Sequence, residues 1–68
     1  MISYAPLWKT MESRKASTYT LRFKDNIGGG TMQRLRNNSP VSTHTIDMLC
    51  RILKCRVQDV MEFVEDEG

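Results

Sequence analysis

The chain has 68 residues and a formal net charge of +2, with 40% hydrophobic and 26% charged residues. A chain of this length forms one small domain that buries only about 60% of its unfolded surface, which leaves little room for an enclosed active site. The composition is that of a globular domain rather than of a disordered chain. No apolar run approaches the roughly 20 residues that span a bilayer and no secretion signal opens the chain, so we expect a cytoplasmic protein without membrane contact.

Charge is distributed unevenly along the chain. Residues 1–56 hold all ten Lys and Arg and three acidic residues, a net +7, whereas residues 57–68 hold five acidic residues and no Lys or Arg, a net −5. A basic body suits a polyanion, because each phosphate that it neutralises releases counterions. We therefore divide the chain into one domain, residues 1–64, and an acidic C-terminal tail, residues 65–68.

Two short helices are predicted before residue 26. Pro6 suits the first turn of a helix that ends near Ala16, since the missing N–H of proline has no helical partner there. The apolar face of this helix consists of Tyr4, Leu7, Trp8 and Met11. Ser17 can cap a second helix that begins at Thr18, because its hydroxyl oxygen can accept a bond from an amide of the first turn.

The stretch from Ser17 to Asn38 predicts two helices joined by an abrupt turn. Asn26 ends the first of them because it tolerates the left-handed conformation, and three glycines follow. Four apolar residues are spaced so that both helices close over a shared core: Leu21, Ile27, Met32 and Leu35. Thr31, Arg34 and Asn38 fall on the opposite face of the second helix. That helix, about residues 29–37, therefore offers polar groups to a groove.

Two further helices complete the predicted fold. Ser42 caps a fourth helix, in which Ile46, Leu49, Cys50 and Leu53 follow the spacing i, i+3, i+4, i+7 of a central packing element. A fifth, short helix has its apolar residues at the same spacing, Val57, Val60, Met61 and Val64. The sequence thus predicts an all-α compact bundle of about five short helices.

The order and spacing of these pieces resemble the helix-turn-helix domain of the Cro and phage-repressor type, the XRE-like family. The matching residues are Thr18 and Leu21, Asn26-Ile27, Thr31-Met32 and Leu35-Arg36-Asn37-Asn38, and the likeness continues through residues 41–60. The resemblance implies a lambda-repressor-like fold. It also implies a small bacterial or phage transcriptional regulator, with repression the favoured role, that binds double-stranded DNA in the major groove as a homodimer.

The resemblance assigns roles to individual residues. Base contacts fall to the start and the outer face of the recognition helix, Gly29, Gly30, Thr31, Gln33 and Arg34. Phosphate contacts fall to the start of the second helix and the end of the recognition helix, Thr18, Tyr19, Arg36, Asn37, Asn38 and Ser39. Arg34 is the candidate for a bidentate contact to guanine, and Thr31 can meet a thymine methyl group. The last helix is the usual dimer region and supplies Val60, Met61, Phe63 and Val64.

Two features depart from the family pattern. The residue after Leu21 is usually small, whereas here it is Arg22, which either extends outward along the surface or holds the two helices further apart. Three successive glycines weaken the start of the recognition helix by up to about 1 kcal/mol for each residue that must be helical. They either allow a close approach to DNA or form a loose turn that Ile27 anchors.

Catalysis and metal binding are not expected. His44 is the only histidine, and no carboxylate pair or nucleophile accompanies it. Cys50 and Cys55 lack the partners of a zinc site, and a disulfide is not expected in a chain without secretory context. We therefore expect no cofactor and no small-molecule ligand. The alternative function is a protein-interaction module, an antitoxin-like or anti-repressor subunit that captures a partner through its last helix, with DNA binding secondary.

Overall fold

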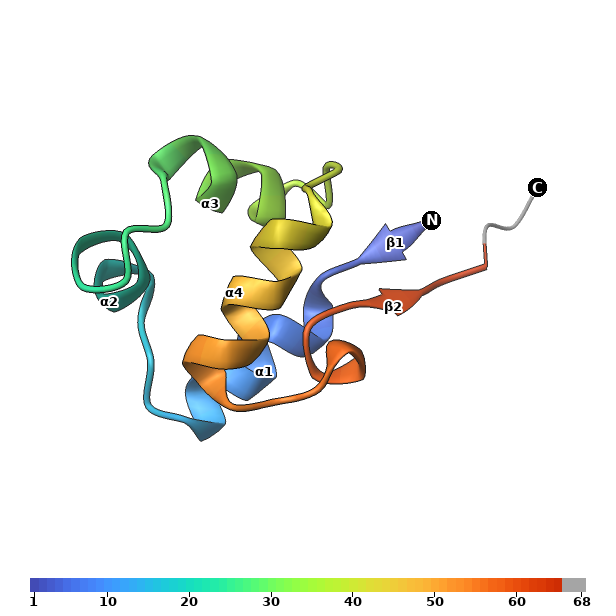
Figure 1. Ribbon diagram of the computed structural model, residues 1–68. Helices are drawn as coiled ribbons and strands as arrows, with labels where there is room; N and C mark the ends of the chain where they lie inside the picture. The colour runs from blue at the N-terminus through green and yellow to red at the C-terminus, as the bar shows by residue number, and fades with distance from the viewer. Residues whose placement is uncertain (66–68) are drawn as a thin grey trace.

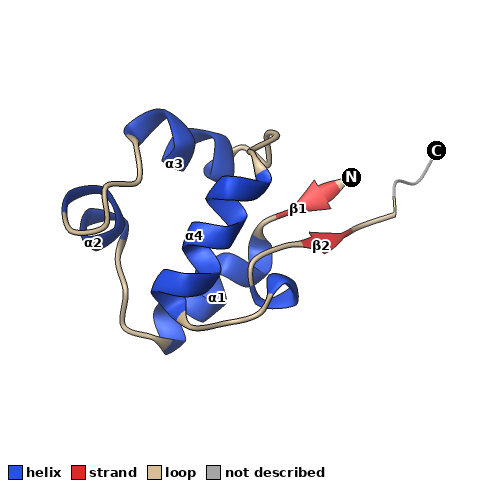
Figure 2. Cartoon of the chain, viewed as in Figure 1, coloured by secondary structure: helices blue, strands red, loops and turns tan. Residues whose placement is uncertain are grey.

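The computed structural model describes residues 1–65, and four α-helices carry most of them (Figures 1 and 2). These helices are α1 (Ala5–Ser13), α2 (Thr18–Phe23), α3 (Gly29–Arg36) and α4 (Thr43–Leu53). A 3-10 turn, η1 (Val57–Asp59), and two short strands, β1 (Ile2–Ser3) and β2 (Glu62–Phe63), complete the described part. None of the helices described is long and apolar enough to cross a membrane. The predicted acidic tail, apart from the exposed Glu65, lies outside the described residues.

Helix α4 runs through the middle of the molecule, and the other helices surround it (Figure 1). The core is made of the apolar faces that the sequence predicted for the first four helices, together with Val60. Its members are Tyr4, Leu7, Met11, Leu21, Ile27, Met32, Leu35, Ile46, Leu49, Leu53 and Val60. Trp8 and Cys50 are half-buried and pack against this core. The 3.6-residue spacing of apolar side chains therefore identified the buried face of each helix correctly.

Side-chain caps start two of the helices, as predicted. The hydroxyl oxygen of Ser17 accepts a hydrogen bond from the amide of Thr20 at 3.1 Å, which fixes the start of α2. The hydroxyl oxygen of Ser42 accepts one from the amide of Thr45 at 3.2 Å, which fixes the start of α4. Each cap satisfies an amide that has no partner within its own helix.

Within three residues of its end, each of the four α-helices is followed by a non-glycine residue in the left-handed conformation. These residues are Lys15, Asn26, Asn38 and Lys54, with φ of 56°, 60°, 55° and 52°. In each case the next residue donates its amide back to a carbonyl in the helix, at 2.8 Å to Met11, 2.9 Å to Leu21, 2.8 Å to Arg34 and 3.1 Å to Cys50. This is the usual way to satisfy the last carbonyls of a helix, although glycine normally holds the left-handed position.

The predicted fifth helix is wrong, and the first helix is shorter than predicted. Residues 57–59 form a single 3-10 turn, after which residues 62 and 63 pair antiparallel with Ser3 and Ile2. The turn closes because the carboxylate of Asp59 accepts the amide of Arg56 at 3.0 Å, and only Val60 of the expected apolar stripe becomes fully buried. Helix α1 ends at Ser13 because Lys15 is left-handed, and Tyr4 is buried as the residue before the helix rather than as part of it.

The left-handed conformation of Lys54 predicts that Lys54→Gly stabilises the domain. A side chain raises the energy of this conformation by about 1–2 kcal/mol, and the greater chain entropy of unfolded glycine offsets about 0.5–1 kcal/mol of the gain. We expect the free energy of unfolding to rise by about 0.5–1 kcal/mol in urea denaturation. Lys9→Gly, at an exposed position inside α1, is the matched control and should lower it by about 1 kcal/mol. Equal losses in both variants would contradict this account.

Candidate nucleic-acid interface

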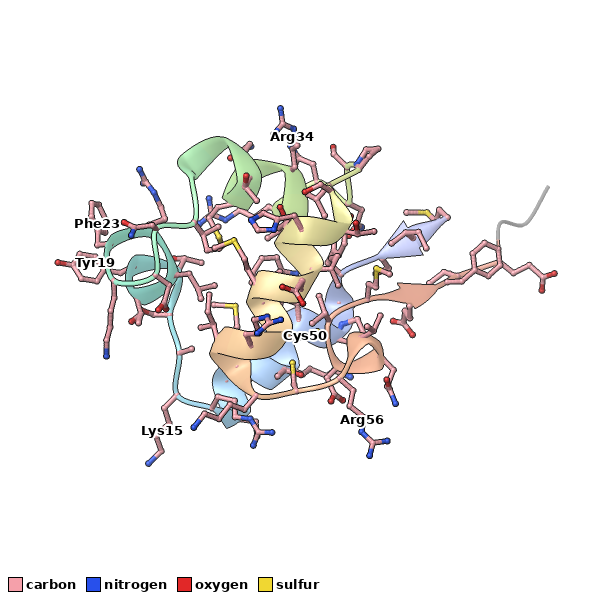
Figure 3. The ribbon with its side chains drawn as sticks, viewed as in Figure 1. Lys15, Tyr19, Phe23, Arg34, Cys50 and Arg56 are labelled. Carbon is pink, nitrogen blue, oxygen red and sulfur yellow. The ribbon has the colours of Figure 1, made fainter. Side chains whose placement is uncertain are left out.

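Helices α2 and α3 form one unit that is closed over an apolar seam. The amide of Ile27 bonds to the carbonyl of Leu21 at 2.9 Å across the turn. The side chains of Leu21, Ile27 and Met32 are all buried, so the turn between the helices is anchored on the core. The unit holds α3 at the surface, where Figure 3 shows Arg34 projecting away from the body.

The outer face of α3 is polar and accessible. Gln33, Arg34 and Arg36 are exposed and Thr31 is half-buried, whereas Met32 and Leu35 on the inner face have no exposed area. Gln33 and Arg34 are therefore turned away from the core, with Thr31 at the border of the buried side. Arg34 and Arg36 lie in the last turn of the helix, where their positive charges also interact favourably with the negative end of the helix dipole.

The three glycines are not needed for a special backbone conformation, since none of them has a positive φ. Gly28 is the residue before α3, with φ −61° and ψ 150°, and its carbonyl accepts the amide of Met32 at 3.0 Å. Gly29 and Gly30 are helical. A Cβ on Gly30 would meet nothing within 4 Å, so no contact among the described residues requires a glycine there. A side chain at Gly30 would instead project into the space in front of the helix.

Arg22, inside α2, extends along the surface and does not hold α2 and α3 apart. It is exposed, and its guanidinium lies 5.1 Å from the ring centre of Phe23. The same guanidinium lies beside Gly29, 3.2 Å from the position that a Cβ would occupy. The side chain thus extends along the surface while Leu21 and Met32 stay fully buried between the helices. Gly29 leaves the room that Arg22 takes.

The phosphate candidates divide into two groups. Tyr19, Arg36 and Asn37 are exposed and Thr18 is half-buried, and among the described residues none of their side chains forms a hydrogen bond or an ion pair. Asn38 and the half-buried Ser39 instead hold the start of the chain: the Asn38 side-chain oxygen accepts the amide of Tyr4 at 3.0 Å, and the Ser39 carbonyl accepts the Tyr4 hydroxyl at 2.9 Å. Sequence reasoning missed these long-range bonds because no local pattern signals them. The side-chain amide nitrogen of Asn38, Nδ2, is the group of this residue that can donate to a phosphate.

The candidate dimer residues also divide. Val60 has no exposed area, because it packs into the core of its own chain and leaves no surface for a second copy. Met61 is half-buried, whereas Phe63 and Val64 are 71% and 42% exposed. Phe63 lies on β2 and Val64 directly follows it, in the segment that the sequence analysis took for a helix. Met1 and Ile2 on the neighbouring strand segment are exposed as well.

The two cysteines are half-buried and free. Burial and the neighbouring Cys50 raise the pKa of the Cys55 thiol above its usual value, so it stays protonated near neutral pH. A protonated thiol is a poor nucleophile and a poor metal ligand. The pair instead packs against the core at the end of α4, where the Cys55 amide bonds to the Cys50 carbonyl.

Comparisons with known proteins identify the family and the fold. A family model for the Cro/C1-type HTH DNA-binding domain matches residues 6–66. The chain is also similar to a solved structure, "Crystal structure of transcriptional regulator VanUg, Form II", with a TM-score of 0.87 and 28% sequence identity over 96% of this chain and 87% of that chain. No curated protein matched the chain.

The surroundings of Gly29 and Gly30 predict different effects of adding a methyl group. Gly30→Ala should raise the free energy of unfolding by up to about 1 kcal/mol, because alanine favours a helix and its Cβ meets nothing. Gly29→Ala should raise it by less, because the Arg22 guanidinium must move away. Urea denaturation of both variants measures the difference. A loss of stability in Gly30→Ala would show that the domain itself needs this glycine.

Proposed function

Because the chain belongs to the Cro/C1-type helix-turn-helix family of DNA-binding domains, we propose that it is a small transcriptional regulator, a repressor, that binds double-stranded DNA with α3 in the major groove. The observation that carries this proposal is the exposed polar face of α3 opposite a fully buried apolar face. The similar solved structure is that of a transcriptional regulator, which supports the same role.

Base recognition depends in this proposal on few side chains. Arg34 can give two parallel hydrogen bonds to guanine, Gln33 can pair with adenine, and Thr31 can contact a thymine methyl group. Gly30 presents no side chain and faces open space, so it lets the start of α3 approach the bases or the backbone closely, whereas the room beside Gly29 is taken by Arg22. With so few base contacts, the shape of the DNA contributes to the choice of site.

Phosphate contacts lie at both ends of the α2–α3 unit in this proposal. Thr18 and Tyr19 open α2, while Arg36, Asn37, Asn38 and Ser39 lie at the end of α3 and in the loop after it. Such contacts position the protein on the duplex without reading its sequence. Each phosphate neutralised by a cation adds about 0.9 to the slope of log affinity against log salt concentration.

A homodimer formed by the strand β2 fits the exposed apolar residues better than one formed by a helix. Val60 belongs to the core, so the accessible part of the predicted dimer region consists of Met61, Phe63 and Val64. Two copies related by a two-fold axis would present two α3 helices to half-sites about 34 Å apart, one turn of the duplex.

The first test is to select bound duplexes from a random pool and then to repeat the measurement with Arg34→Ala. Loss of a bidentate base contact should weaken binding of the selected site by about 1–3 kcal/mol, roughly five- to 150-fold, and relax the preference at one position. Arg36→Gln should weaken all duplexes alike and reduce the salt slope by about 1. Binding that does not respond to salt, or no enrichment from the pool, would contradict the proposal.

Gly30→Ala gives a further control on the same duplex. If α3 approaches DNA closely at this point, the added methyl group lowers affinity although it stabilises the free protein. Unchanged affinity would show that the glycines serve only the turn.

The dimer proposal predicts that Phe63→Glu dissociates the protein into monomers. A charge in an apolar contact between two copies is desolvated without a partner, whereas the same side chain on an exposed strand of a monomer is tolerated. Sedimentation equilibrium measures the mass of both proteins. The control is Val57→Glu, at an exposed apolar residue on η1, which should leave the mass unchanged. A wild-type mass of one chain at micromolar concentration would contradict the proposal.

A further inference from the structure

A second basic surface lies away from the outer face of α3. A cleft of about 500 Å³ opens where the ends of α1, α2 and α4 meet, and four cations line it: Arg14, Lys15, Lys24 and Lys54. Asp25 is the only acidic residue in its lining. In Figure 3, Lys15 and Arg34 lie on opposite sides of the molecule. The recognition helix therefore leaves these four cations unused.

Among the described residues, none of the four cations of the cleft forms an ion pair, and Asp25 offsets only one of the four charges in the lining. The ion pair recorded among the described residues joins Arg51 to Asp47 at 2.9 Å, and Lys15, Lys24 and Lys54 have no carboxylate oxygen within 4.0 Å. Arg14 donates only to the backbone carbonyls of Leu53 and Lys54, at 3.0 and 3.3 Å. Four positive charges around one open cleft repel one another unless an external anion occupies it.

An exposed aromatic pair borders this cleft. Tyr19 and Phe23 on α2 are 71% and 63% exposed, and their ring centres lie 4.8 Å apart. The guanidinium of Arg22 lies against the Phe23 ring. Figure 3 shows both rings projecting from α2 away from the body. Large aromatic side chains exposed side by side are uncommon on a domain that buries its other helical faces, and they mark a contact surface.

The helical repeat of α2 places the two rings next to residues that line the cleft. At about 100° per residue, Tyr19 and Phe23 lie opposite the buried Leu21 and form the outer ridge of the helix. Thr20 and Lys24 lie on one flank of this ridge and line the cleft. Arg22 lies on the other flank, beside Gly29 of α3. The ridge therefore separates the recognition face from the basic cleft and adjoins both.

From this arrangement we infer that the α2 ridge and the adjoining cleft bind single-stranded nucleic acid. Unpaired bases stack on the Phe23 and Tyr19 rings, and the phosphates that follow them lie along Lys24, Lys15 and Lys54 in the cleft. Exposed aromatic rings beside an open cationic groove are the two elements that sequence-tolerant single-strand binding requires. Arg22, whose guanidinium lies over the Phe23 ring, adds a cation that can contact a base or a phosphate.

Other ligands use only part of this surface. A duplex keeps its bases stacked and offers no base face to Phe23. A small anion would find an open cleft with cations on long flexible side chains rather than the enclosed, mostly apolar pocket of a ligand site. An acidic peptide would pair with the lysines but would gain little from a second exposed ring. The combination of rings and cations therefore favours unpaired nucleotides.

The test measures binding of a fluorescent oligothymidylate of about 15 nucleotides by anisotropy, with the full chain and its variants. Phe23→Ala should weaken binding at least about fivefold, the lower end of the contribution of one stacked base. Phe23→Tyr keeps the ring and should restore affinity. Val57→Ala, which removes an exposed apolar side chain from η1, outside both the α2 ridge and the proposed dimer surface, is the control and should change affinity less than twofold. Circular dichroism and thermal unfolding confirm that each variant folds.

The cleft has its own readout in the salt dependence. The triple variant Lys15→Gln, Lys24→Gln, Lys54→Gln should lower the salt slope for the oligothymidylate by about 2, because each phosphate contact to a single strand contributes about 0.7. Arg51→Gln, whose charge is paired with Asp47, should leave the slope unchanged. The affinity for oligouridylate is measured in parallel. Tighter binding of oligothymidylate identifies single-stranded DNA as the ligand, and tighter binding of oligouridylate identifies RNA.

This inference can fail independently of the proposed duplex binding. Arg34→Ala should weaken the selected duplex and leave oligothymidylate binding unchanged. An oligothymidylate affinity that is insensitive to Phe23→Ala overturns the inference. So does a polyglutamate that displaces the oligonucleotide and binds the Phe23→Ala variant as tightly as the wild type, because the surface would then bind an acidic protein. Equal losses of duplex and single-strand binding in Phe23→Ala would also overturn it, by making the ridge part of the duplex interface.

Discussion

Four left-handed residues hold the helices of this domain at their angles. Lys15, Asn26, Asn38 and Lys54 each reverse the chain at a helix end, and the amide that follows each one bonds back into the helix it has left. With helices of 6 to 11 residues, propensity alone supports little structure. The direction in which each apolar stripe enters the core is therefore set by these turns. The core in turn compensates the strain of four non-glycine residues in this conformation.

The recognition helix shows the opposite use of residue types. Its first residues are glycines in an ordinary helical conformation, where alanine would stabilise the free domain. Lysine and asparagine thus occupy the positions at which glycine is favoured, and glycine occupies positions at which it is not. For Gly29 the reason is visible, since the Arg22 guanidinium lies where a Cβ would be. For Gly30 the space is open, so the described part of the domain gives no reason for a glycine there, and a molecule that approaches α3 from outside can supply one.

The surface around α2 and α3 contains three chemically different regions. The outer face of α3 offers hydrogen-bond donors and acceptors, the ridge of α2 offers aromatic rings, and the cleft beyond it offers cations. The short ribbon of the two termini is apolar and exposed, on the other side of the molecule from the α2 rings (Figures 1 and 3). The ribbon is also fastened to the loop after α3 through Tyr4, so a contact made at the ribbon is mechanically connected to the end of the recognition helix.

The sequence alone determined the presence of the four α-helices and the identity of the family. Apolar spacing identified the buried faces of the helices, Ser17 and Ser42 identified two starts, and Asn26 identified the turn, because each of these signals acts between residues a few positions apart. The same local signals placed Thr31, Gln33 and Arg34 on one helix, and the structure shows that Gln33 and Arg34 are exposed and Thr31 half-buried there.

Only the tertiary structure decided what the two ends of the chain do. Residues 57–64 have an apolar spacing that fits a helix, yet they form a 3-10 turn and a strand because Ile2 and Ser3, at the far end of the chain, supply the backbone partners. That pairing moves Val60 into the core and Phe63 to the surface. The cleft of four cations is likewise invisible in the sequence, since it is assembled from three helix ends that are distant along the chain. Long-range pairing leaves no periodic pattern in the sequence. Local patterns therefore predicted the recognition helix but not the structure of the termini.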